Sequence, residues 1–297
     1  MNETQLKELI MKTISEVVSE NGGLPAEDAV CPKPSAVPAS QVSDGEVPDL
    51  SAVDFSQIID VPEPANLEEF RRMRARTVAR IGVGRAGPRY RTNTFLRFRA
   101  DHAAAMDAVF TDVPESLLEE VGVFSVETLC DSKDMYLTRP DLGRRFSKET
   151  VAEIKKRCKL GPDVQIVVSD GLSSSSVTAN IRDILPAIMQ GLKAAGVEAG
   201  TPFFIKHGRV GAMDAVTEAV GSKVTVILLG ERPGLVSSES MSAYMTYGGY
   251  VGIPEASRTV VSNIHRGGTN AAEAGAFIAE LCVRMLKEKA SGLGLKV

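Results

Sequence analysis

Tryptophan is absent from this chain of 297 residues, and the aromatic residues together make up only 5% of it. Proteins that bind single-stranded nucleic acids stack bases on aromatic side chains, so this composition leaves little for that mode of binding. Histidine occurs only at positions 102, 207 and 265. None of the three is paired with a cysteine, an aspartate or another histidine at metal-ligand spacing, so we expect hydrogen-bonding histidines and no metal site.

Cysteine pairs and long apolar runs are also missing. The four cysteines form no C-x-x-C pair, which argues against a structural zinc site or a redox dithiol and favours reduced thiols. Apolar runs such as Val226 to Leu229 are far shorter than the roughly 20 residues that cross a bilayer. The first residues carry Glu3 and Glu8 in place of the basic region of a secretory signal. We therefore expect a cytoplasmic protein with no membrane partner.

The sequence of the first 64 residues predicts a short helix followed by a flexible linker. Residues 1–20 place apolar side chains on one helical face, and residues 21–64 contain seven prolines among serine, alanine and acidic residues. Such a segment buries too little apolar surface to offset its ordering entropy, so we expect a flexible linker. A short amphipathic helix on this linker favours a docking or targeting peptide, the alternative being a helix that folds back or frays. Its mixed charge favours a protein partner over a lipid surface.

Residues 65–150 predict a mainly helical region with concentrated positive charge. Ten arginines and no acidic residue lie between Arg71 and Arg99, in a chain whose net charge is -4. Guanidinium groups form bidentate pairs with carboxylates and phosphates at interfaces. We therefore interpret this region as an Arg-rich interface domain. A phosphate-bearing ligand and a nucleic acid stay open as alternatives.

The Arg-rich stretch contains a formal match to a dinucleotide-binding motif. Gly82-Val-Gly-Arg-Ala-Gly87 fits G-x-G-x-x-G, but that motif needs a buried strand before it and a helix at its third glycine. Arginine-rich sequence precedes this match and Pro88-Arg89 follows it. We interpret the segment as a tight turn.

Residues 151–297 predict alternating strands and helices. Strands are expected at 164–168, 203–205, 224–229 and 259–261, and helices at 147–159, 178–195, 212–220, 238–247 and 270–290. Helices between strands imply crossovers in a parallel sheet, and continuous apolar strands imply cover on both faces. We therefore expect an α/β fold with a Rossmann-like parallel sheet and helices on both faces.

Four polar loops follow the predicted strands, at 169–173, 206–210, 230–234 and 262–268. The carboxyl ends of parallel strands meet at one edge, where open α/β folds bind their ligands. Asp170 and the serines at 173–176 either bind a hydroxyl or phosphate group or cap the next helix. Glu231 and Arg232 favour ligand binding over a mutual ion pair, because charges at a strand end are costly without partners. No nucleophile elbow, phosphate loop or oxidoreductase dyad appears, which indicates a binding domain without its own catalytic machinery.

Several long segments in register resemble the small subunit of ethanolamine ammonia-lyase, from about residue 60 to the C-terminus. These segments are Gly84-Arg-Ala-Gly-Pro-Arg89, Leu96-Arg-Phe98, Ala100-Asp-His102, Tyr136-Leu-Thr-Arg-Pro-Asp-Leu-Gly-Arg-Arg145, Ser169-Asp-Gly-Leu-Ser173, Gly200-Thr-Pro-Phe-Phe204, Gly208-Arg-Val210, Gly230-Glu-Arg-Pro-Gly-Leu235 and Ser262-Asn-Ile-His265.

The resemblance implies an enzyme that converts ethanolamine to acetaldehyde and ammonia with adenosylcobalamin. In that family a large subunit, a TIM barrel, holds the substrate and the catalytic residues, and the small subunit covers the cobalamin in a hetero-oligomer. The resemblance makes residues 151–297 a Rossmann-like cobalamin-binding domain. It also implies that residues 1–20 direct the protein to a bacterial microcompartment.

The same resemblance assigns the cofactor contacts. They fall on Val210, with Arg209 beside it as a further candidate, on Glu231, and on Val260. The family has a cysteine at the position of Val260, and a valine offers no thiol, so this contact requires backbone atoms. Asn263-x-His265-x-x-Gly268 is similar to a motif that ligates cobalt through histidine. Asn stands in place of its Asp, and the resembled family keeps the cofactor's own base on the metal, so we expect no ligand role for His265.

Two alternatives come from other classes. An autonomous nucleotide-binding protein would use the same sheet edge. It should have a glycine-rich loop around the phosphates after its first strand, and residues 169–173 contain too little of such a motif. An Arg-rich nucleic-acid-binding module would lose affinity steeply with salt.

Overall fold

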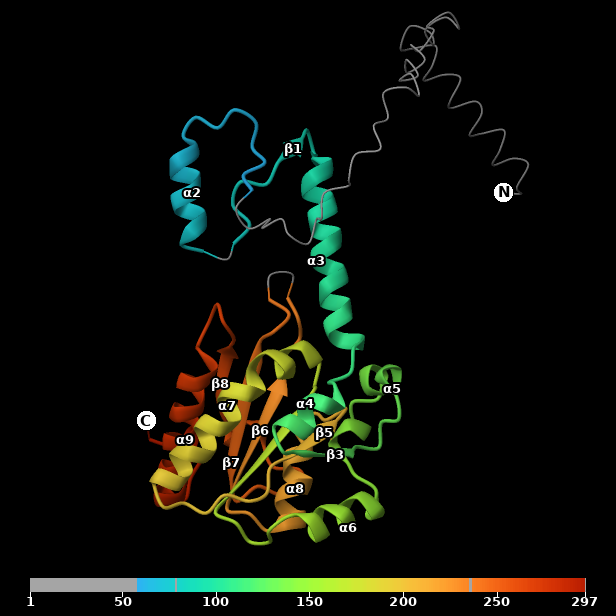
Figure 1. Ribbon diagram of the computed structural model, residues 1–297, viewed down its shortest axis with the longest axis vertical. Helices are drawn as coiled ribbons and strands as arrows, with labels where there is room; N and C mark the ends of the chain where they lie inside the picture. Colours follow the sequence, from blue (N-terminus) through green and yellow to red (C-terminus); the bar gives the residue numbers. More distant parts are fainter. Residues whose placement is uncertain (1–57, 78, 235–236, 297) are drawn as a thin grey trace, which may run out of the picture. The chain divides into compact units, whose positions relative to one another are not determined.

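Six strands form the central sheet of the computed structural model, which describes residues 58–77, 79–234 and 237–296 (Figure 1). Their order is β3-β5-β4-β6-β7-β8. The strands are β3 (Phe124–Glu127), β4 (Val164–Ser169), β5 (Phe203–Lys206), β6 (Val224–Gly230), β7 (Met241–Tyr247) and β8 (Thr259–Ile264). The main helices around them are α4 (Glu115–Glu120), α5 (Lys133–Thr138), α6 (Lys148–Arg157), α7 (Ser174–Ala194), α8 (Ala212–Val220) and α9 (Ala271–Glu288). The predicted α/β fold class is confirmed.

The sheet is mixed, and this corrects the expectation of an all-parallel sheet. Strands β3, β5, β4 and β6 are parallel, whereas β7 runs antiparallel to both β6 and β8. The predicted short helix at 238–247 is wrong, because this segment contains β7. Met241, Ala243 and Met245 join one core, and Tyr244 between them packs on the other face. This period of two is that of a strand.

Strand β3 comes from residues 65–150, where we expected mainly helices. It has only four residues, Phe124-Ser-Val-Glu127, and forms the outer strand next to β5. A run this short gives no clear periodicity. Its position shows that the central sheet begins before residue 150.

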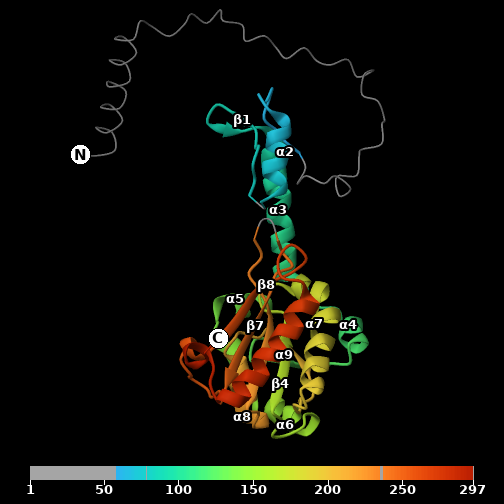
Figure 2. The ribbon, with the colours of Figure 1, turned by 90° about the vertical axis from the view of Figure 1, so that its left-hand side faces the viewer.

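Helices cover the two faces of the sheet and enclose two cores. Ile166 and Val168 of β4 join the core beneath α7 and α9, which pack side by side (Figure 2). Val167, between them, joins the core on the face of α6 and α8. Every residue of β4 and β6 is buried. Because burying one such aliphatic side chain stabilises a fold by roughly 1.5–3 kcal/mol, these strands fix the sheet between its helices.

Local signals set the helix ends. Ser173 caps α7, since its side chain accepts a hydrogen bond from the backbone N–H of Ser176. Helix α8 ends at Gly221, whose φ of 72° is in the left-handed region that glycine adopts without strain. The helices expected at 147–159, 178–195, 212–220 and 270–290 are confirmed as α6, α7, α8 and α9, with shifts of up to a few residues at their ends.

The four polar loops follow strands that run in one direction. Strands β4, β5 and β6 are parallel, and β8 is parallel to β6 because both are antiparallel to β7. The loops after these strands therefore lie at the same edge of the sheet, as predicted.

The described chain before the sheet contains α2 (Leu67–Ala75), a hairpin of β1 (Arg85–Ala86) and β2 (Arg89–Tyr90), and α3 (Thr92–Phe110). Gly87 at the hairpin tip has a φ of 61°, which confirms the tight turn and rules out a dinucleotide loop at this segment. The predicted helix at 1–20 and the linker up to residue 57 lie outside the described residues. Within the described part of the chain, no helix has the length and apolarity required to traverse a bilayer.

Candidate functional site

Glu231 is held at the end of β6 by its backbone and its side chain. The preceding Gly230 is packed so closely that a Cβ there would overlap the carbonyl oxygens of Asp170 and Ser173. The backbone N–H of Glu231 donates to the carbonyl of Ser240 at 3.0 Å and closes the base of the loop between β6 and β7. These contacts fix the point from which the carboxylate projects.

The Glu231 carboxylate is oriented by a tyrosine of the neighbouring strand. The hydroxyl of Tyr244 donates to Glu231 Oε1 at 3.0 Å. Burial first, and the nearby carboxylate second, raise the pKa of Tyr244 to about 12, so the phenol stays protonated and donates at neutral pH. Glu231 and Arg232, both described by the structure, form no ion pair with each other. The alternative of a mutual pair is therefore wrong.

Val260 and Val210 lie on the same face of the sheet as Tyr244. Val260 is the direct partner of Tyr244 in the antiparallel pairing of β7 and β8, and directly paired side chains share a face. Val260 is 44% exposed. Val210, near the end of the connection from β5 to α8, packs against the same core as Tyr244. Val210 and Val260 thus lie on the α8 face of the sheet, the face from which Tyr244 holds the Glu231 carboxylate.

Arg209 turns toward α5. Its Nη2 donates to the carbonyl of Tyr136 at 2.6 Å, and its guanidinium carbon lies 4.1 Å from the centre of the Tyr136 ring. Its backbone N–H donates to the carbonyl of Gly143 at 2.8 Å. The Nε atom is buried and has no hydrogen-bond partner among the described residues. Arg209 therefore holds Tyr136 in place, and its Nε–H is left without an acceptor among the described residues.

Tyr136 of α5 is buried against the loop that follows β5. Its hydroxyl donates to the carbonyl of Gly208 at 3.3 Å. Burial is the main cause that raises its pKa, and the charges of Arg209, Asp170 and Glu231 are all near enough to act on it. The sequence analysis noted Tyr136 only as part of a resembling segment. The structure places it against Gly208 and Arg209, in the loop after β5.

Asp170 at the end of β4 belongs to a buried ion pair. Its Oδ2 accepts from Lys133 Nζ at 2.7 Å, and the side chains are 1% and 9% exposed. Its Oδ1 accepts from the backbone N–H of His207 at 2.8 Å and from the Ser169 hydroxyl at 3.2 Å. Asp170 therefore joins two strand ends to α5. Ser173, and not Asp170, caps the next helix.

One group of side chains has the spacing of a metal site. Carboxylate oxygens of Asp112 and Asp170 and a ring nitrogen of His207 lie within 4.8 Å of one another. Lys133 already neutralises Asp170, and Lys206 Nζ lies 3.3 Å from Asp112. His207 Nδ1 lies 3.2 Å from the carbonyl of Cys130, which requires this nitrogen to carry the proton. The two carboxylates are therefore paired with lysines, and His207 is held by a backbone carbonyl, so the three side chains already have partners within the chain.

His265 uses both ring nitrogens within its own loop. Nδ1 accepts from the backbone N–H of Gly267 at 3.1 Å, so Nε2 carries the proton and donates to Asn263 Oδ1 at 2.8 Å. This confirms the expected hydrogen-bonding role. His102 is exposed on α3.

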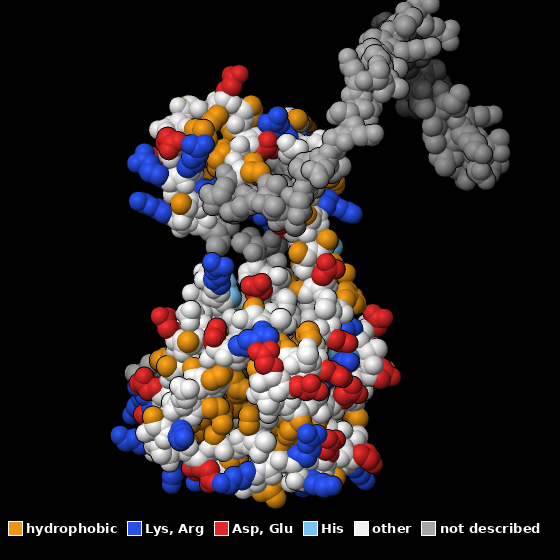
Figure 3. Space-filling model, viewed as in Figure 1, with side chains coloured by type: hydrophobic (Ala, Val, Ile, Leu, Met, Phe, Trp, Pro, Cys, Tyr) orange, Lys and Arg blue, Asp and Glu red, His pale blue; other side chains and the backbone are white. Residues whose placement is uncertain are grey.

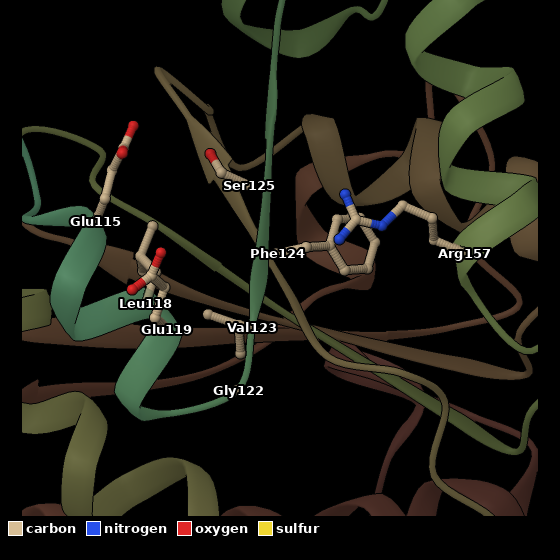
Figure 4. Close-up of a pocket in the computed structure, with 8 residues that line it drawn as sticks. All are labelled: Glu115, Leu118, Glu119, Gly122, Val123, Phe124, Ser125 and Arg157. Atoms are coloured by element: carbon tan, nitrogen blue, oxygen red, sulfur yellow. The ribbon is translucent and has the colours of Figure 1, made fainter.

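A shallow hollow of about 430 Å³ lies beside β3 and α4 (Figure 4). Arg157 stands over the ring of Phe124, 3.9 Å from its centre, at one side of this hollow. Glu115 and Glu119 project from α4 on the other side (Figure 4). None of its lining residues belongs to the four strand-end loops, so the hollow is separate from the candidate site.

Comparison with known proteins identifies the family. Residues 67–296 match the family model of the ethanolamine ammonia-lyase light chain (EutC). The ethanolamine ammonia-lyase small subunit of Clostridium tetani is 52% identical over 297 residues, covering 100% of this chain and 99% of the relative. Those of Fusobacterium nucleatum and Clostridioides difficile are 49% and 50% identical, and each match covers 100% of both chains. The chain belongs to the family of ethanolamine ammonia-lyase small subunits.

Proposed function

We propose that this chain is the small subunit of an adenosylcobalamin-dependent ethanolamine ammonia-lyase, which converts ethanolamine to acetaldehyde and ammonia. It covers a cobalamin held between itself and a large subunit, and the large subunit supplies the catalytic residues. The surface on the α8 face around Glu231, Val210 and Val260 is the part that contacts the cofactor.

The chemistry of this surface fits a cobalamin. Glu231 is half-buried, and Tyr244 occupies only one of its oxygens; no other described residue hydrogen bonds to the carboxylate. A cobalamin has a broad ring whose edge carries amide groups, and a carboxylate accepts hydrogen bonds from amide N–H groups. Val210 and the exposed Val260 provide apolar contact on the same side. The oriented carboxylate with a free oxygen is the observation that carries the proposal.

Val260 makes its contact through backbone atoms. It replaces the cysteine that we expect in the family, and its side chain has no hydrogen-bonding group. Strand β8 is the last strand at its end of the described sheet, so backbone groups on its outer side are not used by a further strand. This edge offers donors and acceptors to a neighbouring group.

The chain's own residues position and shield the cofactor. Glu231 accepts from an amide, Tyr244 keeps the carboxylate in place, and the two valines exclude water, which protects reactive species from side reactions. Adenosylcobalamin, when bound, supplies the radical chemistry of the reaction. The titratable groups Asp170 and His207 at the strand ends, and Lys133 of α5, are buried and engaged in hydrogen bonds or an ion pair within the chain. This supports a partner as the source of acid and base groups.

Co-expression with an ethanolamine ammonia-lyase large subunit tests the proposal. The two chains together are expected to co-purify, to bind adenosylcobalamin as followed by its absorbance, and to release ammonia from ethanolamine. The purified chain alone is expected to release none. Ammonia release by the chain alone, or failure of the two chains to form a cobalamin-binding complex, contradicts the proposed function.

The localisation rests on residues 1–20. Their amphipathic pattern supports a peptide that directs the protein into a bacterial microcompartment. A fluorescent protein fused to these residues is expected to gather in assembled shells. A version in which Leu6, Ile10 and Val17 are changed to serine serves as the control and is expected to stay diffuse. Diffuse fluorescence of the unchanged fusion beside assembled shells contradicts this role.

A further inference from the structure

Helix α3 carries an apolar surface that the described chain leaves uncovered. Only Thr94 and Ala108 of its 19 residues are buried. Phe95, Met106 and Phe110 are 53%, 43% and 47% exposed. Isolated helices in water are marginal, and most helical stability in proteins comes from packing an apolar face. A helix of this length with so little burial therefore lacks the contact that normally stabilises it.

The exposed residues form one continuous stripe. Phe95, Arg99, His102, Met106 and Phe110 follow one another at spacings of four, three, four and four, which places them on one side of the helix. Leu96, beside the stripe, is 58% exposed. Figure 3 shows hydrophobic side chains along the surface of α3. Spacing of this kind is typical of a helix that packs against another element.

The hairpin of β1 and β2 is fixed to the start of the same helix. The backbone N–H of Gly84 donates to the Thr94 hydroxyl at 3.1 Å, and the ring of Tyr90 meets that of Phe98 edge-on, with centres 5.1 Å apart. Arg85 stacks over Tyr90, 4.5 Å from its centre, and donates to its hydroxyl. The hairpin and the first half of α3 thus present one surface.

The arginines of this region divide into two sets. Arg80 and Arg97 pair with Asp101, and Arg91 pairs with Asp60, so part of the positive charge is neutralised within the chain. In contrast, Arg85, Arg89 and Arg99 are exposed, and no carboxylate of the described residues pairs with them. Guanidinium groups that no carboxylate of the described residues neutralises, next to exposed apolar side chains, are suited to bidentate contacts with carboxylates of another chain.

We propose that α3 and the hairpin dock on the large subunit through Phe95, Met106 and Phe110, with Arg85, Arg89 and Arg99 pairing to its carboxylates. This docking surface rests on the proposed function only in that a large subunit exists. A second copy of this chain is the weaker occupant. No acidic residue lies between Arg71 and Arg99, so a copy stacked on the same surface brings arginine against arginine.

Matched substitutions test the docking surface by co-purification with the large subunit. Phe110→Asp on α3 is compared with Phe277→Asp on α9, because both side chains are 47% exposed. Phe110→Asp is expected to raise the Kd for the large subunit by roughly tenfold or more, the scale of losing an interface anchor. The double variant Met106→Asp, Phe110→Asp is expected to raise it further. Phe277→Asp is expected to assemble like the wild type. Equal assembly of both variants overturns the docking surface.

The arginines are tested by salt dependence. The triple variant Arg85→Ala, Arg89→Ala, Arg99→Ala is expected to associate more slowly, with a smaller effect of salt on the association rate than in the wild type. An unchanged rate and salt dependence overturn the arginine part of the proposal.

Hydrogen exchange of the wild-type proteins avoids any effect of substitution on folding. The amides of α3 are expected to become more protected when the large subunit binds. Unchanged protection of α3 in a complex that still binds cobalamin overturns the docking surface and leaves the proposed function standing. A second outcome concerns the chain alone at high concentration. If α3 is protected there, and sedimentation shows a dimer that Met106→Asp dissociates, the stripe serves self-association. That result also overturns the proposal.

Discussion

The hydroxyl of Tyr244 donates a hydrogen bond to Glu231 Oε1 at 3.0 Å and so connects the middle of β7 to the first residue after β6. Tyr244 also packs against the core beneath α8 and pairs with Val260 across the sheet. One side chain therefore links the carboxylate at the strand end to the exposed face of β8. The proposed cofactor contacts depend on this arrangement.

Removing the Tyr244 hydroxyl should weaken cofactor binding without removing the carboxylate. Tyr244→Phe leaves Glu231 free to rotate, and loss of one hydrogen bond of this kind costs about 1 kcal/mol, or roughly fivefold in affinity. The Kd of the assembled enzyme for adenosylcobalamin measures this effect. Tyr250→Phe, at a side chain that is 51% exposed, is the control and should leave the Kd unchanged. A Tyr244→Phe enzyme with wild-type affinity contradicts the orienting role.

The buried pair of Arg258 and Asp214 should be a main contributor to stability at β8. Two hydrogen bonds of 2.8 Å join the guanidinium to the carboxylate, and the side chains are 2% and 5% exposed. Burial disfavours the cation, but hydrogen bonds to Asp214 and Glu255 raise the pKa of Arg258. Asp214→Ala removes the buried partner of Arg258 and leaves only the exposed Glu255 paired with it, so it is expected to lower the free energy of unfolding by about 3–5 kcal/mol.

Urea denaturation of the purified chain measures this loss. Glu153→Ala is the control, because it breaks an exposed helical ion pair with Arg157. Exposed pairs contribute little, so its denaturation midpoint should stay close to that of the wild type. Similar midpoints for Asp214→Ala and Glu153→Ala contradict the structural role of the buried pair.

Lys133 and Asp170 should be energetically coupled. Either single change to alanine leaves one buried charge and is expected to cost about 3–5 kcal/mol, whereas the double variant should cost clearly less than the sum. A double-mutant cycle on the free energy of unfolding measures the coupling. The exposed pair Lys223–Asp163 provides the comparison cycle and should show much weaker coupling. Additive costs at Lys133 and Asp170 rule out a direct stabilising pair.

The buried thiols should make the protein less stable at high pH. Burial raises the pKa of Cys282 to about 12, whereas an unfolded thiol ionises near about 8.5. The stabilising contribution is therefore complete below the unfolded value and is lost as the pH rises toward 12. By pH 10 it should have fallen by about 2 kcal/mol. Urea denaturation from pH 8 to 10 measures the change.

The variant Cys282→Ala should remove this part of the pH dependence. Alkylation provides a second readout, because Cys282 should react only after unfolding. Labelling of Cys282 in the native chain at the rate seen in urea contradicts its burial.

The sequence predicted which edge of the sheet carries the polar loops, because its strands are regular. Runs such as Val164–Val168 and Val224–Leu229 are apolar at almost every position. Near-continuous apolar residues are typical of a strand that is covered on both faces. Their polar ends therefore located the edge. The segment 241–247 was misassigned as a helix, although its core-facing residues alternate with a period of two.

The partners of the site residues could not be predicted, because they come from distant segments. Lys133 reaches Asp170 across 37 positions of the chain, and Asp60 meets Arg91 across 31. No local pattern links such residues, since only the folded topology brings them together. Tyr244 was hidden for the related reason that its strand was assigned as a helix. The arginine run likewise concealed which guanidinium groups are neutralised within the chain.

Titration of the assembled enzyme with adenosylcobalamin tests the central claim most directly. Glu231→Ala removes the oriented acceptor, and a hydrogen bond to a charged group contributes about 1.5–3 kcal/mol, so the Kd is expected to rise by roughly tenfold to a hundredfold. Glu239→Ala, at an exposed position of the same loop, is the control and should bind like the wild type. An unchanged Kd for Glu231→Ala in a fully assembled complex contradicts the assignment of this surface to the cofactor.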